Sequence, residues 1–506
     1  MAYDEIVVGS GAGGAVVAAR LSEDGTRSVL LLEAGPDFGS VDALPEPLRD
    51  PFVTFTGADW GWTANMTPER VLPYPRGRTL GGSTAVNAAV AMRPTPGDLD
   101  RWVRAGAPDW SLEACLPYFR RLESDPAGDP AVHGTGGPIP IRRQPRDGWQ
   151  PITRAFAEEM AATGHPVIED HNDHRVVGAG PTAHNVRDGI RWSTASAYLE
   201  PARSRSNLTI RAGVLVDRLL LDGDRVVGVE ALTGEGRTER FEGARVTLAA
   251  GAVATPPILL RSGIGPADDL RGLGIPVVLD VPAVGRNLQD HTGAFVTALA
   301  RPGVEQDPDN YFAFYSRSET EPWFLALLAL FSPQALGSFY GDPSADPVIA
   351  ISAGLARPHS RGTVTLAGRD PQVQPVIDLD FLSHPQDQAD IRAGARAAWA
   401  ALHGEHLCPL VKEVSPAVAA VIDDDDALLA HARANCGSGF HPVGTARMGA
   451  EPGPDVVTDQ EGRVFGVPGL RIADASLIPL QVSSPTNLTC LMIGERIADS
   501  LLHDAD

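Results

Sequence analysis

The N-terminal part of the chain combines two apolar runs with a glycine-rich turn. Residues 6–8 form a short β-branched run, residues 9–14 are mostly glycine, and residues 15–21 are apolar at helical spacing. A second apolar run, residues 28–32, ends at Glu33. Apolar strands without polar interruption suit a parallel sheet that is covered on both faces. The pattern therefore predicts a strand, a turn, a helix and a strand in an α/β sheet.

A second β-rich region follows residue 206. We predict strands there at residues 208–210, 214–221, 225–232 and 245–249. The Asp-Gly-Asp sequence at 222–224 is typical of a hairpin turn. Residues 42–76 are instead irregular and rich in Pro, Trp and Thr, which predicts a long connection. Long connections inside compact enzymes are usually functional.

The stretch from about residue 300 to 435 differs in character, with Pro-rich turns between apolar runs. Residues 323–331 (WFLALLALF) are predicted to form a helix that is buried or lines a pocket, with contact to a membrane surface as the alternative. Further helices are predicted at 387–403 and 427–434. Four acids at 423–426 precede the last of these, and acids at a helix start complement its dipole. We interpret them as a solvated cap, and we expect no metal site.

The length, net charge and cysteine pattern of the chain limit the classes of function that it can have. A chain of 506 residues is long enough for more than one structural region. The net charge of −22, from 64 acids and 42 basic residues, argues against nucleic acid as a partner. The four cysteines form no CxxC pair, no secretory signal is visible, and no apolar run is long enough to span a bilayer. We expect a cytoplasmic protein with no membrane span.

The glycine-rich turn at residues 9–14 matches the GxGxxG pattern. Its glycines permit a tight turn, close approach of the backbone to a pyrophosphate, and close packing of helix on strand. The helix that follows offers free N–H groups to phosphates. Glu33, nineteen residues past Gly14, can accept hydrogen bonds from ribose hydroxyls. We predict a dinucleotide site, which can be for FAD or NAD, formed by Gly9, Ser10, Gly11, Ala12, Gly14, Glu33 and Ala34.

Six further segments, in family order, resemble the glucose-methanol-choline (GMC) family of FAD-dependent oxidoreductases. They are residues 76–87 (RGRTLGGSTAVN), 192–199 (WSTASAYL), 251–266 (GAVATPPILLRSGIGP), 284–291 (VGRNLQDH), 441–449 (HPVGTARMG) and 470–479 (LRIADASLIP). The resemblance implies an α/β fold with a Rossmann-like FAD-binding domain interwoven with a sheet-plus-helices substrate domain. Residues 1–300 would be mainly FAD-binding, with substrate-side segments near 42–76 and 100–190. Residues 301–435 would be mainly substrate-binding, and residues 436–506 would return to the FAD domain with the catalytic histidine.

The same resemblance implies which residues lie around the FAD. They are Arg78, Thr79, Gly81, Gly82, Asn87, Val216, Ala250, Asp474, Ala475, Pro485 and Thr486. Asp474 can also be interpreted as a helix cap. Some family members attach FAD covalently through a histidine just before the asparagine of the first signature, where this chain has Val86. Valine cannot form that bond, so we predict non-covalent FAD.

His441 opens the segment that resembles the family's catalytic stretch. A neutral imidazole can take the hydroxyl proton of an alcohol while hydride leaves its carbon for flavin N5. The second catalytic position, normally His or Asn, falls at Pro485, which has no side-chain donor or acceptor. We expect Asn487 to supply the missing polar contact; otherwise His441 works without an ordinary partner. His291 is also family-typical, and we interpret it as structural, near the cofactor.

The function expected from the resemblance is oxidation of a small-molecule alcohol, with oxygen or another acceptor reoxidising the flavin. A FAD-containing lyase of the hydroxynitrile lyase type, without net redox, is one alternative, and a flavin-binding protein without catalysis is another. Several aromatic residues can form an apolar pocket wall or simply pack in the core: Tyr311, Phe312, Phe314, Tyr315, Trp323, Phe324 and Phe331. They favour an apolar or aromatic primary alcohol over a sugar.

Overall fold

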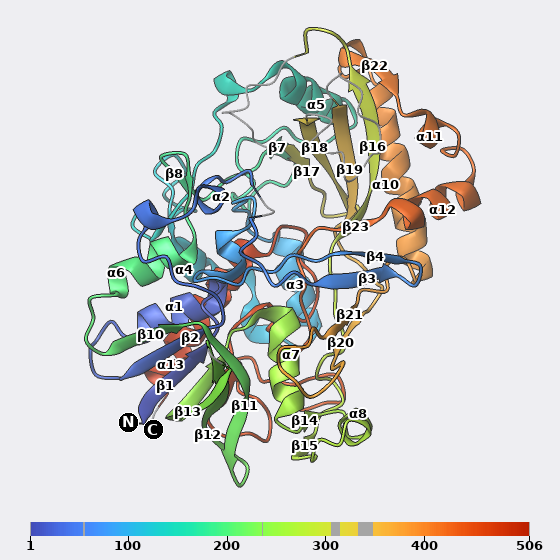
Figure 1. Ribbon diagram of the computed structural model, residues 1–506. Coiled ribbons are helices and arrows are strands. Elements are labelled where there is room, and N and C mark those ends of the chain that lie inside the picture. The colour runs from blue at the N-terminus through green and yellow to red at the C-terminus, as the bar shows by residue number, and fades with distance from the viewer. Residues whose placement is uncertain (1, 54–55, 235, 305–313, 332–347, 505–506) are drawn as a thin grey trace.

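The computed structural model describes residues 2–53, 56–234, 236–304, 314–331 and 348–504. Two seven-stranded sheets organise these residues, and each sheet has its own apolar core (Figure 1). Strands from early, middle and late parts of the chain enter the first sheet, and the second sheet is built from the segments between them. The α/β fold with two interwoven regions is therefore confirmed.

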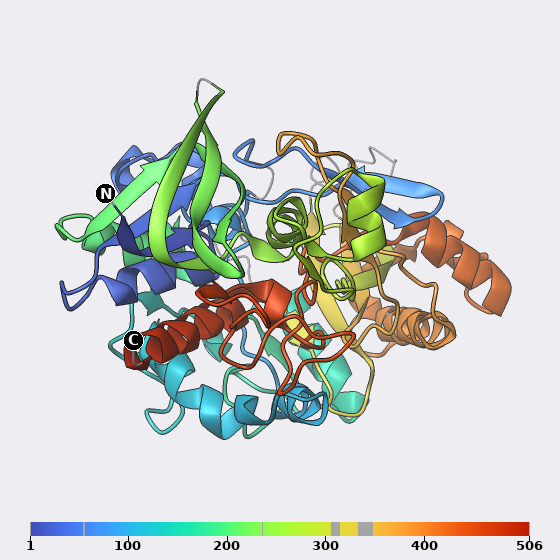
Figure 2. The same cartoon turned by 90° about the horizontal axis from the view of Figure 1, so that it is seen from below.

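The first sheet contains the predicted parallel strands. Its parallel part consists of β10 (Leu208–Ala212), β2 (Val29–Glu33), β1 (Tyr3–Val8), β13 (Arg237–Leu248) and β24 (Leu470–Ile472). Helix α1 (Ala12–Leu21) packs against α13 (Asn487–His503), which is the red helix near the C-terminus in Figure 2. The last helix of the chain thus covers the first strand–turn–helix unit.

A three-stranded meander extends this sheet. Strands β11 (Val214–Asp222) and β12 (Arg225–Thr233) form the predicted hairpin, in which Asp222 pairs with Arg225. Strand β13 begins eight residues earlier than the predicted strand at 245–249. Its first half pairs antiparallel with β12, and its second half pairs parallel with β1. One long strand therefore joins the meander to the parallel core.

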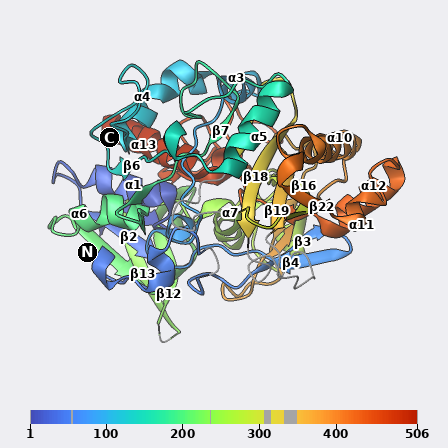
Figure 3. The same cartoon turned by 90° about the horizontal axis from the view of Figure 1, so that it is seen from above.

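The second sheet is antiparallel. It consists of β22 (Val411–Val414), β16 (Thr292–Ala300), β19 (Val348–Leu355), β18 (Trp323–Phe331), β17 (Phe314–Ser316), β7 (Ala179–Pro181) and β23 (Gly437–Ser438). Helix α10 (Pro385–His403) packs on β19 and β16, and α5 (Pro151–Ala162) packs on β17 and β18 (Figure 3). Helix α12 (Asp425–Asn435) begins after Asp424, whose carboxylate accepts hydrogen bonds from two backbone N–H groups. The predicted acidic cap is confirmed.

The prediction of a helix at residues 323–331 is wrong, because this run forms strand β18 between β17 and β19. Leu325 and Leu327 belong to the core that α10 covers. Phe324 and Ala326 pack on the other face with Ala356 and Tyr315. Both faces of the strand are apolar, so the sequence lacks the alternation that distinguishes a strand from a buried helix.

The prediction that residues 42–76 are irregular is only partly right. They contain β3 (Thr63–Thr67) and β4 (Arg70–Pro73), which join β21 (Val376–Asp378) and β20 (Thr363–Thr365) in a four-stranded sheet.

The remaining α-helices of the described residues are α2 (Glu46–Arg49), α3 (Pro96–Arg104), α4 (Leu112–Leu122), α6 (Glu200–Ala202), α7 (Gly251–Arg261), α8 (Ala267–Gly272) and α11 (Pro416–Ala419). The remaining strands are β5 (Glu123–Ser124), β6 (Ile139–Pro140), β8 (Val186–Arg187), β9 (Ile190–Arg191), β14 (Ile264–Gly265) and β15 (Leu279–Asp280).

Candidate active site

The glycines of the first turn leave no room for side chains, except toward a neighbouring cavity. Gly9 has a φ of +93°, a conformation that favours glycine. A Cβ on Gly13 would lie 1.7 Å from the Ala473 carbonyl oxygen, and one on Gly14 would lie 1.9 Å from that of Gly9. A Cβ on Gly11 would meet nothing within 4 Å. The turn is therefore packed against protein on one side and open at Gly11, where α1 begins.

Glu33, at the end of β2, ties this turn to the next glycine segment. Its buried carboxylate accepts hydrogen bonds from the Ser10 N–H (3.1 Å), the Ser10 hydroxyl (2.6 Å) and the Gly35 N–H (2.8 Å). The Ser10 Oγ in turn accepts from the Gly81 N–H at 3.1 Å. Burial raises the pKa of Glu33, and these hydrogen bonds oppose the rise. Glu33 thus organises a glycine cradle, formed by the turn at residues 9–14 and the segment at Gly81 and Gly82, and it also lines that cradle.

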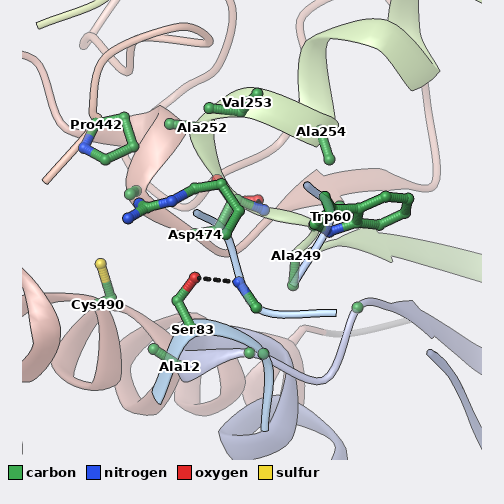
Figure 4. Close-up of a pocket in the computed structure, with 18 of the residues that line it drawn as sticks. Ala12, Trp60, Ser83, Ala249, Ala252, Val253, Ala254, Pro442, Asp474 and Cys490 are labelled. Atoms are coloured by element: carbon green, nitrogen blue, oxygen red, sulfur yellow. Dashed lines mark hydrogen bonds between the residues drawn. The ribbon is translucent and has the colours of Figure 1, made fainter. Parts of the chain in front are cut away.

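A cavity of about 430 Å³ runs along this cradle. Figure 4 looks into it, with Ala12 and Ser83 on one side and Ala252 to Ala254 of α7 on the other. Most of the predicted site residues line it: Gly9, Ser10, Gly11, Ala12, Glu33, Ala34, Gly82, Asn87, Val216, Ala250, His441, Asp474, Ala475, Pro485, Thr486 and Asn487. Segments that are far apart in the sequence therefore meet at one pocket.

Four predicted cofactor residues lie behind the lining. Gly14 packs on Gly9, and Gly81 donates its N–H to Ser10. The Thr79 hydroxyl donates to the Pro36 carbonyl at 3.1 Å, and the Arg78 guanidinium stacks on the Trp60 ring with 4.9 Å between its carbon and the ring centroid. In this structure these residues support the cradle and do not line the cavity.

Asp474 serves as both a cap and a pocket residue. One carboxylate oxygen accepts from the Ser476 N–H and hydroxyl, at 2.8 and 2.5 Å. The other accepts from the Gly251 N–H at 2.8 Å and the Thr255 hydroxyl at 2.6 Å, at the start of α7. Burial raises the pKa of this carboxyl, although four hydrogen bonds stabilise its ionised form. The two interpretations of Asp474 are therefore compatible.

His441 lines the same cavity, and its backbone and ring are both held in place. Its N–H donates to Asp290 Oδ1 at 2.7 Å, and its carbonyl accepts from the Gln481 side chain at 2.7 Å. Its ring nitrogen Nδ1 lies 2.9 Å from Nδ1 of His291. Burial, followed by the nearby His291 and Arg76, holds the pKa of His441 well below its usual value. The imidazole is neutral at neutral pH, as a base must be.

Pro485 also lines the pocket, and so does the polar side chain of Asn487, two residues later. The Asn487 amide donates to the Asn185 side-chain oxygen at 3.2 Å. Its own Oδ1 is buried without a hydrogen-bond partner among the described residues. A buried polar atom without a partner is costly, and a ligand group can satisfy it. This geometry suits the predicted polar contact from Asn487.

The aromatic wall differs from the set suggested by the sequence. Tyr315 lines the cavity, and Phe324 stacks behind it with 5.2 Å between ring centroids. Phe314 packs in the core against Trp149, and Trp323 packs near Gly394 of α10. Tyr311, Phe312 and the Phe331 side chain lie outside the described residues. Trp60, Trp62 and Phe440 also line the cavity and were not predicted, because no local sequence pattern marks them.

These features fit FAD. The open side of Gly11 and the start of α1 suit a pyrophosphate. The same cavity is lined by Asn487, whose side-chain carbonyl has no partner among the described residues and suits a polar group of the attached ring system. Among the described residues, no helix is long and apolar enough to cross a membrane.

Comparisons with known proteins agree with this picture. A family model described as GMC oxidoreductase matches residues 3–293, and a second with the same description matches residues 358–494. An oxygen-dependent choline dehydrogenase from Brucella anthropi is 35% identical, with 99% of this chain and 96% of that protein covered. A similar choline dehydrogenase from Escherichia coli is also 35% identical over the same shares.

Solved structures show the same similarity in three dimensions. Pyridoxine 4-oxidase from Mesorbium loti is 30% identical with a TM-score of 0.90, over 99% of this chain and all of that chain. A formate oxidase from Aspergillus oryzae RIB40, studied for its FAD modification, is 26% identical with a TM-score of 0.88, over 99% and 98% of the two chains. A fungal aryl-alcohol oxidase shares the fold, with a TM-score of 0.82 at 23% identity over 99% of this chain and all of that one.

Proposed function

Because the chain belongs to the GMC family of oxidoreductases and binds FAD, we propose that it oxidises a small alcohol to an aldehyde or ketone, with His441 as the base. The observation that carries this proposal is that one cavity is lined both by the glycine cradle and by His441. A substrate in that cavity can therefore reach the imidazole and the cofactor together.

The proposed chemistry needs a proton acceptor at the substrate hydroxyl. The neutral ring of His441 takes the O–H proton as the carbon–oxygen bond becomes a carbonyl, and the imidazolium that forms stabilises alkoxide character. FAD, when bound, supplies the two-electron acceptor for the hydrogen that leaves carbon. The His441 N–H donates to Asp290, and this hydrogen bond fixes the backbone that carries the ring. General-base assistance of this kind contributes about 10²- to 10⁴-fold in rate.

We propose a neutral, apolar or aromatic primary alcohol as the substrate. Tyr315, Trp62 and Phe440 line the described part of the cavity. The carboxylates that line this part are Glu33 and Asp474, and their oxygens already accept hydrogen bonds from protein groups. Arg76 also lines it, and a guanidinium disfavours a second cation nearby. These features support a substrate closer in chemistry to pyridoxine than to choline, the substrates named for two relatives.

Anaerobic mixing with a panel of alcohols tests the proposal. We expect benzyl-type alcohols and pyridoxine to bleach the flavin faster than choline does. Failure of every alcohol to bleach it would contradict alcohol oxidation, and cleavage of a hydroxynitrile without bleaching would identify the lyase alternative. With an active alcohol in hand, hydrogen peroxide release in air compared with reduction of a dye shows whether oxygen or another compound is the acceptor.

A further inference from the structure

We propose that His291 is a positioning residue that fixes the tautomer of His441, with hydrogen on Nδ1 and a free lone pair on Nε2. The proposal deepens the role of His441 and rests on the proposed function. It departs from the interpretation of His291 as merely structural. Its basis is the hydrogen-bond geometry of the two rings and of the carbonyl behind them.

The two rings share a single hydrogen. Nδ1 of His291 and Nδ1 of His441 are 2.9 Å apart, and the rings are nearly perpendicular, at 82°. Two nitrogen atoms at this distance form a hydrogen bond only if one donates and the other accepts. The direction of this hydrogen bond depends on which of the two rings carries a hydrogen on Nδ1.

The other side of His291 decides the direction. Its Nε2 lies 2.8 Å from the Val482 carbonyl oxygen, which can only accept. Nε2 of His291 must therefore carry a hydrogen. A neutral His291 then has a lone pair on Nδ1, so His441 donates its Nδ1–H. The reverse arrangement would require His291 to be an imidazolium.

The surroundings keep His291 neutral. Its side chain is buried, and burial lowers its pKa. The charged groups that act on the pair are Asp290 and Asp98, which favour a cation, and Arg76, which opposes one at His441. Asp290 already accepts from Tyr74, Ser438 and the His441 backbone, so both of its oxygens are engaged by other donors. Two adjacent imidazoles also resist charging together.

The residues around the two rings, Phe324 and Gly439, fit this arrangement. Phe324 packs edge-to-face with the His291 ring, with 5.6 Å between the ring centroids. Gly439 leaves room between the rings, because a Cβ there would lie 3.0 Å from His291 Cβ and 3.1 Å from His441 Nδ1. Nε2 of His441 has no hydrogen-bond partner among the described residues, and its ring lines the cavity. Nε2 can take a proton while the Nδ1–H bond to His291 stays intact.

Two substitutions separate positioning from packing. His291→Phe keeps a ring of similar size but removes the acceptor. His291→Asn can place its side-chain oxygen near the same point and accept the His441 Nδ1–H. We expect His291→Phe to slow flavin reduction at saturating alcohol by roughly 10- to 100-fold. In the wrong tautomer, Nε2 of His441 carries a hydrogen and cannot accept the proton of the alcohol. His291→Asn should stay within about threefold of wild type, because it preserves this hydrogen bond. Both variants should bind FAD normally.

An equal loss in the two variants, or no loss in His291→Phe, would overturn the proposal. A neutron structure of the wild-type holoenzyme in deuterated buffer gives a readout that does not depend on turnover. We expect deuterium on Nδ1 of His441 and on Nε2 of His291, whereas deuterium on Nδ1 of His291 would refute the assignment. If no alcohol reduces the wild-type flavin, the proposed function fails, and the neutron map still decides the tautomer.

Discussion

Asn487 lines the pocket with a carbonyl oxygen that has no partner among the described residues, while its amide is held by Asn185. We expect Asn487→Leu to slow anaerobic flavin reduction by about 2- to 10-fold, the effect of one neutral hydrogen bond. Thr489→Val, on the same helix and away from the cavity lining, is the matched control and should leave the rate unchanged. Stopped-flow absorbance measures both, and a wild-type rate in Asn487→Leu would show that the side chain has no part in the reaction.

Val86 lies in the cavity lining at the place where some family members carry the histidine that binds FAD covalently. A hydrocarbon side chain cannot form that bond, so acid denaturation should release all of the yellow flavin into the supernatant. Absorbance of the separated pellet and supernatant provides the measurement. Yellow colour retained on the washed polypeptide would show attachment at another residue.

At the scale of elements, Gly354 of β19 lies under the aromatic ring of Phe324 on β18. A Cβ on Gly354 would lie 2.3 Å from the Phe324 ring, which is packed between Tyr315 and His291. We expect Gly354→Ala to lower the free energy of unfolding by about 1 to 3 kcal/mol through overpacking. Gly368→Ala is the control, because its Cβ would meet nothing within 4 Å. Urea denaturation of both variants tests this, and equal midpoints would contradict the tight packing of this strand pair.

The elements differ in how far the sequence defines them. The turn at residues 9–14 could be predicted because its glycines constrain the backbone locally, and Gly13 and Gly14 do lie too close to neighbouring carbonyls for a side chain. Strand β18 could not, because apolar cores cover both of its faces and remove the alternation. Trp60 and Phe440 were missed for a related reason, since only tertiary packing brings them to one cavity.

At the scale of the whole molecule, a buried charge cluster joins segments that are distant in sequence. His133 lies between Glu123 and Asp170, with Nδ1 and Nε2 at 2.9 and 2.8 Å from their carboxylates. Arg93 pairs with Glu123, and Arg143 pairs with Asp125, the third acid of the cluster. Three cationic side chains therefore balance three carboxylates, and the cluster needs no metal ion for its charge.

This cluster predicts a pH dependence of stability. Burial alone would lower the pKa of His133, but hydrogen bonds to Asp170 and Glu123 outweigh it and raise the pKa to about 9. Because a raised folded-state pKa favours folding while the group is protonated, the contribution is full below about pH 6.5 and is lost as the pH rises through 9. Urea midpoints of wild type and His133→Gln should converge between pH 7 and 10. A constant difference across that range would contradict the shift.

The central claim is that His441 accepts the substrate proton, and anaerobic stopped-flow reduction of the bound flavin tests it most directly. His441→Ala should retain FAD, because the cradle residues around Glu33 and Asp474 are untouched. With the best alcohol of the panel, we predict flavin reduction slower by about 10²- to 10⁴-fold than in wild type. Reduction at the wild-type rate in FAD-loaded His441→Ala would contradict the account.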